Sequence, residues 1–190
     1  MNKKKVHEDA DLIADMNKTM QKLEGVIEHM DEKRGKIFID WLNTQSTYLQ
    51  WEEGFDPSYL KAYKRGEIVF AHFGFNVGAE YGGMHYAVVV SDSSKMNPNV
   101  NVIPMSSLEE GQTEEDIHKS RVFLGVINGL NDKKAMAIPD QLRPISKIRI
   151  VRPKKAKETV YKLNSEQMDA IDDKVRRMFT RLRSEDKKEK

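Results

Sequence analysis

Cysteine is absent from all 190 residues of the sequence. Its absence excludes a disulfide-stabilised scaffold, a zinc site with cysteine ligands and catalysis by a thiol. Long apolar runs are missing as well. No stretch approaches the ~20 apolar residues of a membrane-spanning helix, and none follows the basic N-terminal residues as it would in a signal peptide. Both absences favour a protein of the reducing cytoplasm that makes no contact with a membrane.

A surplus of charge of one sign is also missing. The 32 basic and 30 acidic residues give a formal net charge of +2. This near-neutral total excludes a polycation that coats nucleic acid, but it allows a local basic cleft, because electrostatic steering depends on where the charges lie. The five histidines show no spacing typical of metal ligands, so we predict no metal and no other cofactor.

The character of the chain changes near residue 60. Before it, apolar residues recur at helical spacing and predict two helices, over 8–31 and 34–52, which we expect to form an antiparallel hairpin or a coiled-coil arm. Gly54 and Pro57 then mark a connector. We therefore predict three parts, which are an N-terminal helical arm over 1–60, a second domain over 61–184 and a frayed, charged tail over 185–190.

Short runs of β-branched and aromatic residues follow from Arg65 on. They predict five strands, over 67–73, 86–90, 100–105, 122–124 and 134–138. Residues 145–150 predict a helical turn and a brief extended segment, and a capping pattern at Asn164 or Ser165 begins a last helix. Short strands joined by Gly, Asn and Ser turns are typical of a small β-barrel. The predicted fold class is α+β, mainly β.

A glycine-rich loop, residues 75–85, joins the first two predicted strands. Glycines at positions 78, 82 and 83 allow positive φ and the close approach of a ligand backbone. Taken alone, this pattern fits an ordinary hairpin loop as well as a binding loop.

Three blocks of the sequence, in this order, resemble the MazF/PemK family of toxin endoribonucleases. The first, residues 65–69 with the loop 77–83, resembles R-G-[DE]-[IV]-[VY] followed by V-G-S-E-Q-G-G. The second, residues 102–107, resembles V-V-P-[LI]-T-S, and the third, residues 140–147, resembles [DE]-Q-[IL]-R-T-[IV]-D-K. The resemblance extends from Arg65 to about residue 182 and includes none of the N-terminal arm.

The resemblance implies an SH3-like small β-barrel with a C-terminal helix, usually a homodimer, that cleaves single-stranded RNA at short sequences without metal. Attack by the ribose 2′-hydroxyl leaves a 2′,3′-cyclic phosphate and a 5′-hydroxyl. Such a protein is the toxin of a type II toxin–antitoxin system, and its cognate antitoxin commonly inserts a disordered acidic segment along the cleft. The family's key residues are an Arg just after the G-G-x of the loop and the Thr or Ser of the second block.

This sequence departs from the family pattern at the first key position, where His85 replaces the Arg. RNA cleavage needs proton transfers, and histidine suits them because its unperturbed pKa of ~6.5 lies near operating pH. A neutral histidine holds a phosphate less well than arginine does. We therefore expect a separate cation, with Arg143 as the first candidate and Arg121 as the second. The alternative is that His85 is a half-buried strand residue in an inactive member of the family.

Ser106 occupies the second key position. Its hydroxyl could donate a hydrogen bond to a non-bridging phosphate oxygen where charge develops, or it could simply end a strand. The predicted catalytic residues are therefore His85 and Ser106. Six further residues are candidates for RNA binding, namely Asn76, Gly78, Glu80, Arg121, Gln141 and Arg143.

The chemistry of these candidates differs. The side-chain amide of Gln141 suits the reading of a base edge that a single strand exposes. Glu80 could pair with His85 or accept hydrogen bonds from a base, and a solvated loop carboxylate is an equal alternative. Asn76 and Tyr81 could add hydrogen bonding and stacking.

Two functions without catalysis stay open beside the ribonuclease. One is a toxin of the same fold that poisons DNA gyrase by contact, and the other is an inactive RNA binder. The N-terminal arm could extend a dimer interface, cover the RNA cleft, bind a partner or pack on its own barrel.

Overall fold

The computed structural model describes residues 4–130 and 132–180. It divides into two compact units, one that ends at Thr47 and one that begins at Tyr48. The predicted tail, 185–190, lies outside the described residues. Among the residues that are described, no helix has the length and apolar character needed to cross a membrane.

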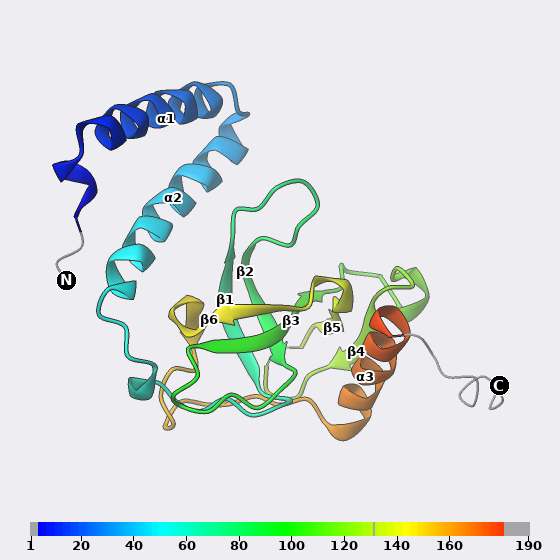
Figure 1. Cartoon of the computed structure of the whole chain (residues 1–190). Coiled ribbons are helices and arrows are strands. Elements are labelled where there is room, and N and C mark those ends of the chain that lie inside the picture. The colour runs from blue at the N-terminus through cyan, green and yellow to red at the C-terminus, as the bar shows by residue number, and fades with distance from the viewer. Residues whose placement is uncertain (1–3, 131, 181–190) are drawn as a thin grey trace. The chain divides into compact units, whose positions relative to one another are not determined.

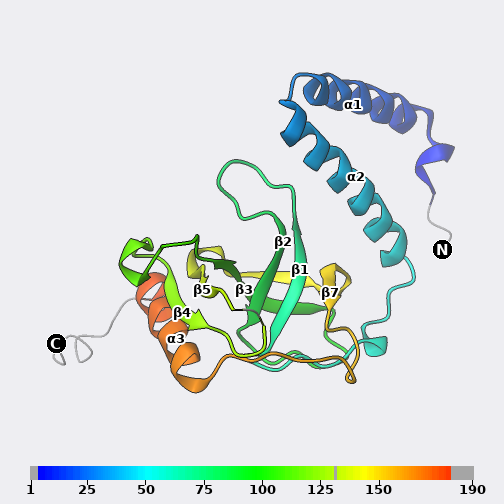
Figure 2. The ribbon, with the colours of Figure 1, turned by 180° about the vertical axis from the view of Figure 1, so that it is seen from behind.

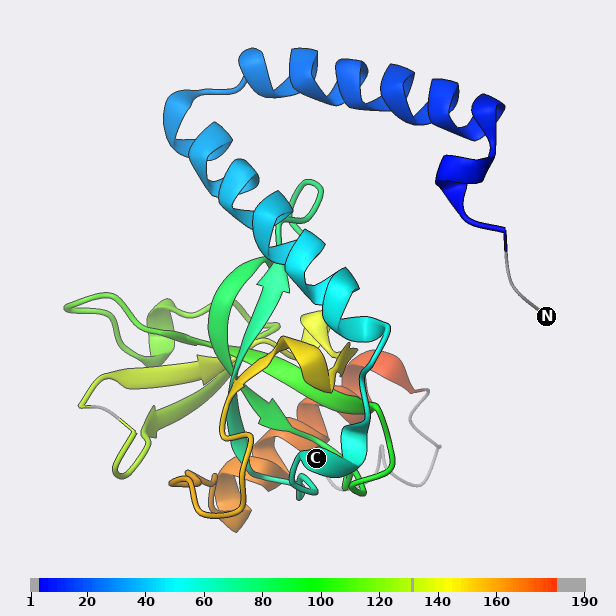
Figure 3. The ribbon, with the colours of Figure 1, turned by 90° about the vertical axis from the view of Figure 1, so that its left-hand side faces the viewer.

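The first unit is helical. A 3-10 turn, η1 (Val6–Glu8), precedes α1 (Ala10–Glu28), and α2 (Glu32–Glu52) follows after a short bend. Asp9 caps α1 by accepting a hydrogen bond from the Leu12 amide. The two predicted helices are therefore confirmed. They diverge from the bend that joins them, and α1 has no buried residue (Figure 3).

The second unit is built around one seven-stranded antiparallel sheet (Figure 1). The strand order is β4-β5-β3-β2-β1-β7. Strand β6 is added to β3, whose first part pairs with β6 and whose last part pairs with β5. The strands are β1 (Ile68–Gly74), β2 (Gly83–Val89), β3 (Asn99–Ser107), β4 (Val122–Val126), β5 (Lys134–Ala137), β6 (Arg143–Ser146) and β7 (Ile150–Arg152). The remaining elements are the 3-10 turns η2 (Pro57–Tyr59), η3 (Glu114–Asp116), η4 (Pro139–Gln141) and η5 (Lys147–Arg149), and the helix α3 (Ser165–Phe179).

Both faces of the central strands are buried, because side chains alternate between them. Ile68, Val88 and Ile103 belong to a core that also contains Ile171 of α3 and residues of β4 and β5. Their neighbours in the chain turn to a second core between β1, β2, β3, β6 and β7. Figures 1 and 2 show α3 lying against β4, on the side of the first core. The predicted fold class, a small β-barrel with a C-terminal helix and an N-terminal helical hairpin, is confirmed.

Two parts of the sheet differ from the sequence-based prediction. The segment 145–150, predicted as a helical turn and a brief extended stretch, does contain a helical turn, η5, but two strands flank this turn, β6 before it and β7 after it. Strand β2 also begins earlier than predicted, at Gly83, so that His85 lies in a strand and not in the preceding loop. The pairing of β1 with β2 explains the early start of β2, because Ala71 of β1 pairs directly with His85.

The Arg65–Gly66–Glu67 segment joins the sheet to α3. Arg65 forms an ion pair with Asp172 of α3. Gly66 has a φ of +83°, a left-handed conformation that favours glycine. Glu67 is 6% exposed and forms a buried ion pair with Lys61. The first block of the family-like pattern therefore contributes to the architecture of the barrel.

Candidate active site

His85 and Ser106 lie at neighbouring strand ends. Ala87 of β2 pairs with Pro104 of β3, and His85 and Ser106 each lie two residues beyond this pair, in the same direction along the two strands. Both residues are half-buried, and both border a small hollow of about 110 Å³. The two predicted catalytic residues are thus brought together by β-sheet pairing between segments that are far apart in the sequence.

The hydroxyl of Tyr81 lies between them. Its oxygen is 3.1 Å from Nδ1 of His85 and 3.2 Å from the carbonyl oxygen of Met105. The Tyr81 and His85 rings pack with their centroids 4.5 Å apart. Ser106 also hydrogen-bonds the Tyr81 side chain. Tyr81, His85 and Ser106 therefore form one hydrogen-bonded group, which we call the Tyr–His–Ser cluster.

Burial sets the protonation states of this cluster. It lowers the pKa of His85 below the ordinary value of 6.5, and a hydrogen bond to the backbone of Gly82 partly opposes the shift. It raises the pKa of Tyr81 above the ordinary value of 10.0, against the hydrogen bond with Ser106 and the positive charge of Arg121. At neutral pH the imidazole is therefore uncharged and the phenol keeps its proton.

The imidazole faces the Tyr81 hydroxyl through Nδ1. That hydroxyl has one hydrogen, which it donates to the carbonyl oxygen of Met105, so the donor and acceptor between Tyr81 and His85 follow from the tautomer of the ring. In the tautomer with its hydrogen on Nε2, Nδ1 has a lone pair that can take a proton from Tyr81.

The loop between β1 and β2 is held closed by two amide side chains. Asn76 donates through Nδ2 to the carbonyl oxygens of Phe73, at 3.2 Å, and Tyr81, at 2.8 Å. The Tyr81 amide donates to Oε1 of Gln141 at 3.1 Å, across 60 residues of chain. Gly82 allows the closure, since a Cβ there would lie 2.6 Å from the carbonyl oxygen of Gly74. These contacts position Tyr81 beside His85.

Gln141 and Arg143 support the same loop from η4 and β6. Arg143 donates through Nη2 to Oε1 of Gln141 at 2.6 Å, and its guanidinium lies 5.7 Å from the centroid of the Phe73 ring. The amide oxygen of Gln141 thus accepts from two donors. Both contacts use the oxygen of the Gln141 amide, so its nitrogen is the atom that could bind a ligand.

Arg121 is the cation whose charge acts on the cluster. It precedes β4 and forms an ion pair with Asp140, and its side chain is 24% exposed. Ser120 also donates to Asp140, at 3.2 Å. The pair fixes the position of the guanidinium, and the charge of Arg121 still favours the deprotonated form of Tyr81.

Gly78 and Glu80 are not brought to the cluster. Both lie exposed in the loop, and the Glu80 amide donates to the carbonyl of Val77 at 3.3 Å. Within residues 4–130 and 132–180, Glu80 forms no ion pair, with His85 or with any other residue. Contact of these two residues with RNA stays a prediction.

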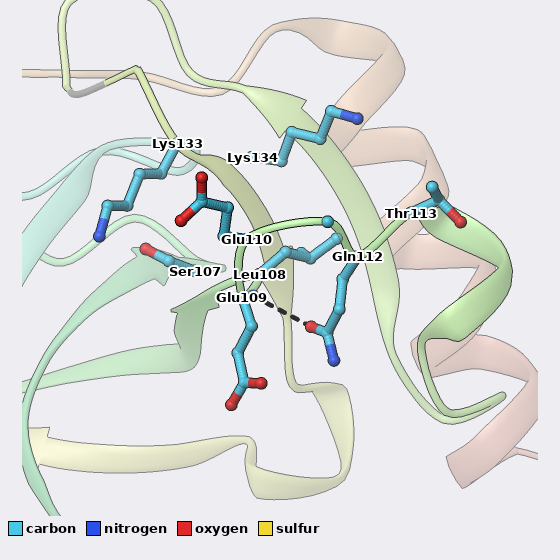
Figure 4. Close-up of a pocket in the computed structure, with 9 residues that line it drawn as sticks. Ser107, Leu108, Glu109, Glu110, Gln112, Thr113, Lys133 and Lys134 are labelled. Atoms are coloured by element: carbon cyan, nitrogen blue, oxygen red, sulfur yellow. Dashed lines mark hydrogen bonds between the residues drawn. The ribbon is translucent and has the colours of Figure 1, made fainter.

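A larger hollow of about 620 Å³ opens beside Ser106. Its walls are Ser107 and the loop that follows it, together with Lys133 and Lys134 at the start of β5. Figure 4 shows Lys133 on the side of Ser107 and Glu110, and Lys134 pointing away from them. The hollow therefore carries charges of both signs. Within the described ranges, no three His, Asp or Glu side chains are arranged to hold a metal.

The central position of Tyr81 was not predicted from the sequence, which suggested only that Asn76 and Tyr81 could add hydrogen bonding and stacking toward RNA. A signal for it was present, because the pattern V-G-S-E-Q-G-G has Gln where this chain has Tyr81. His85 replaces the Arg that follows in the same pattern. In the structure these two departures contact each other.

Comparisons with known proteins place the chain. A protein-family model described as "PemK-like, MazF-like toxin of type II toxin-antitoxin system" matches residues 64–179. Among solved structures, MazF (Form-I) from Deinococcus radiodurans is similar with a TM-score of 0.47 and 18% identity, over 62% of this chain and 96% of that chain. The MazE-MazF (Form-II) structure from the same organism gives a TM-score of 0.40 and 16% identity, over 62% and 94%. No curated protein matches the chain.

Proposed function

The chain belongs to the PemK-like, MazF-like toxin family of type II toxin–antitoxin systems, and we propose that it is a ribonuclease that cleaves single-stranded RNA inside the strand. In the proposed reaction the ribose 2′-hydroxyl attacks the adjacent phosphorus and leaves a 2′,3′-cyclic phosphate and a 5′-hydroxyl. One observation carries the proposal. The Tyr81 hydroxyl joins a neutral imidazole to a serine hydroxyl at the position where the family pattern has its Arg.

Tyr81 and His85 act as a proton relay in this proposal. The relay uses the tautomer of His85 with its hydrogen on Nε2, and the Tyr81 hydroxyl turns from the Met105 carbonyl to Nδ1 of His85, 3.1 Å away. The Tyr81 oxygen then takes the proton of the 2′-hydroxyl and passes its own proton to Nδ1. The reverse transfer then delivers a proton through Tyr81 to the departing 5′-oxygen. One P–O bond forms and one breaks, and both side chains regain their starting states. His85 thus works through Tyr81, which touches the substrate.

The developing negative charge needs donors and a cation. We assign the donor to Ser106, whose hydroxyl can turn from the Ser107 carbonyl, 3.3 Å away, to a non-bridging phosphate oxygen. We assign the cation to Arg121, because its charge already acts on Tyr81. Arg143 is the second candidate, since its guanidinium contacts Gln141 and the Phe73 ring, at the loop that positions Tyr81.

Binding of the RNA strand is assigned to the surfaces next to the cluster. The amide nitrogen of Gln141 would read a base edge, and the exposed residues Gly78 and Glu80 would line the path of the strand. Asn76 would act by holding the loop. Past Ser107, the hollow with Lys133 and Lys134 offers room for the next nucleotides.

We extend the proposal to partners. A cognate antitoxin would restrain the enzyme, as membership in a toxin family of type II systems suggests. We further propose that the chain forms a homodimer and acts on mRNA in the cytoplasm. Sedimentation of the purified protein measures its oligomeric state, and a monomer at all concentrations would contradict the homodimer.

Incubation of the purified protein with single-stranded RNA in EDTA tests the function. We expect fragments with 2′,3′-cyclic phosphate and 5′-hydroxyl ends, because every group of the proposed reaction is a protein side chain. RNA in which each 2′-hydroxyl is methylated is the control and should stay intact. Binding without cleavage would instead identify an inactive RNA binder, and arrest of gyrase without RNA loss would identify a poison.

The cleavage rate should depend on pH in two limbs. The relay needs neutral His85, so the rate should rise as this residue loses its proton, with a midpoint below 6.5 because burial lowers its pKa. It needs protonated Tyr81, so the rate should fall only above pH 10.0. Single-turnover rates across this range measure both limbs. A rising limb centred above pH 7 would contradict the assignment of His85.

A further inference from the structure

A further hollow lies beside η5 and shares no residue with the Tyr–His–Ser cluster. It measures about 440 Å³ and belongs entirely to the unit that begins at Tyr48. Its walls come from the C-terminal end of α2, the segment around η2, the η5 turn and Lys154. Figures 1 and 2 both show η2 and η5 on the same side of the sheet. We call this hollow the Trp51 cleft.

Aromatic side chains form one wall of the Trp51 cleft. Trp51 is 53% exposed and Tyr59 is 83% exposed, which is high for rings of this size. Tyr48 holds Trp51 in place, with ring centroids 5.7 Å apart, and itself packs edge-on against His72 of β1 at 6.2 Å. The exposed tryptophan face is therefore presented by a fixed framework and not by a loose end of chain.

Positive charge lies beside this wall. Nζ of Lys154 is 5.9 Å from the centroid of the Trp51 ring. Lys147 is fully buried at the edge of the cleft, and its Nζ donates to the carbonyl oxygens of Ser94, at 2.6 Å, and Lys95, at 3.1 Å. Its Nζ also lies 5.6 Å from the centroid of the fully buried Tyr63 ring, so this ammonium group belongs to the interior. Of the two lysines that border the cleft, Lys154 is therefore the one that can contact a ligand.

One carboxylate also borders the cleft. Asp56 accepts hydrogen bonds from the side chain and the amide of Ser58, the second at 2.8 Å, and these contacts lower the pKa of its carboxyl group. This negative charge disfavours a phosphate beside Asp56, so Lys154, next to the Trp51 ring, is the group that can hold one. The cleft therefore has an aromatic wall with one cation beside it.

We propose that the Trp51 cleft binds one base of single-stranded RNA and its adjoining phosphate, and so anchors the strand at a distance from the cleavage site. A base would stack on Trp51 or Tyr59, and Lys154 would contact the phosphate. Stacking on aromatic side chains with nearby cations is the usual chemistry of sequence-tolerant binding of single strands. The proposal rests on the proposed function, because RNA is the strand in question.

Trp51 itself provides the readout. The chain has two tryptophans, so Trp41→Phe leaves Trp51 as the single fluorophore of this type. The ligand is a 2′-O-methyl RNA oligonucleotide long enough to reach both sites, which binds but cannot be cleaved. We expect saturable quenching of Trp51 fluorescence, with Tyr59→Ala and Lys154→Gln each weakening the affinity about 10-fold. Lys155→Gln, at an exposed neighbour outside the cleft, is the matched control and should bind normally.

Two further ligands show whether the cleft binds an RNA strand, a free nucleotide or only an anion. A mononucleotide should quench Trp51 only at concentrations at least about 10-fold higher than the oligonucleotide needs, and inorganic tripolyphosphate, which has no base to stack, should displace the oligonucleotide only at similarly high concentrations. Equal affinity for the mononucleotide would overturn the proposal in favour of a free-nucleotide site. Equal affinity for tripolyphosphate would reduce the cleft to an anion site, and oligonucleotide binding without any change in fluorescence would exclude it from the RNA path.

Cleavage kinetics separate this inference from the ribonuclease assignment. The Tyr59→Ala/Lys154→Gln variant should raise KM for long RNA about 10-fold with kcat unchanged, and should cleave an RNA that spans only the cleavage site normally. A matching loss of kcat on that short RNA would contradict an anchoring role. Quenching by the uncleavable strand, in a protein that cleaves no RNA, would refute the enzyme and leave the cleft in place.

Discussion

Replacement of His85 by Ala is expected to lower the rate of RNA cleavage about 10²- to 10⁴-fold, which is the usual contribution of one positioned proton acceptor or donor. The imidazole takes the proton of the Tyr81 hydroxyl in the proposed relay, across a contact of 3.1 Å. Without it, the Tyr81 oxygen has no base behind it and must take the 2′-hydroxyl proton as a neutral phenol. Cleavage rates measured under single-turnover conditions give the size of the loss.

Two variants sharpen this test. Tyr81→Phe removes one hydroxyl and should lose as much activity as His85→Ala, and the double variant should be no worse, because groups that act as a unit are not additive. His29→Ala, at an exposed histidine of the other unit, should cleave normally. End-mapping of the fragments from each variant checks that the residual cleavage has the same chemistry. Undiminished cleavage by His85→Ala would remove this residue from the reaction.

Much of the barrel could be predicted from local patterns. Apolar and β-branched runs predicted β1 to β5 because these strands pack on two cores, and the capping pattern at Asn164 marked the start of α3, where its side chain accepts from the Gln167 amide. Around residues 145–150 only one brief extended stretch was predicted where the structure has two strands, because both strands are short and β6 contains Pro144, which cannot donate to a ladder. They form because β6 pairs with β3 and β7 pairs with β1, and such contacts between distant parts of the chain leave no local pattern in the sequence.

The candidate site was predictable only in part. The resemblance placed His85 and Ser106 at the right strand ends, but the position of Tyr81 depends on a loop closed by Gln141, 60 residues away. No periodicity in the sequence encodes such a contact. The amide of Gln141 was predicted to read a base, and the structure adds a positioning role for its oxygen.

The first block of the family-like pattern shows how a motif can match for structural reasons. Glu67 stands at its acidic position, and its carboxylate lies in the interior with the ammonium group of Lys61. Nζ of Lys61 also lies 4.8 Å from the centroid of the Tyr63 ring, and the Tyr63 hydroxyl donates to the carbonyl of Pro153 at 2.8 Å. This buried group ties the segment before β1 to the segment after β7. Its loss should act on stability and not on chemistry.

Glu67→Ala is therefore expected to destabilise the barrel unit by about 3–5 kcal/mol, because it leaves the 9% exposed Lys61 as a buried charge without its partner. For a unit of this size the midpoint of thermal unfolding should fall by roughly 10 °C. Circular dichroism or calorimetry measures the shift. Below the unfolding transition, the variant should keep the cleavage rate of the unaltered protein, since the pair lies outside the Tyr–His–Ser cluster.

A double variant separates the penalty of the stranded charge from the value of the pair. Lys61→Met combined with Glu67→Leu replaces both charges by apolar groups of similar length, and such replacements of buried ion pairs are often neutral or stabilising. We expect the double variant to unfold at a higher temperature than Glu67→Ala alone. If both variants lost the same stability, the packing around Glu67 would be the cause and not the unpaired ammonium. If neither lost any, the pair would have no part in holding the segment before β1 in place.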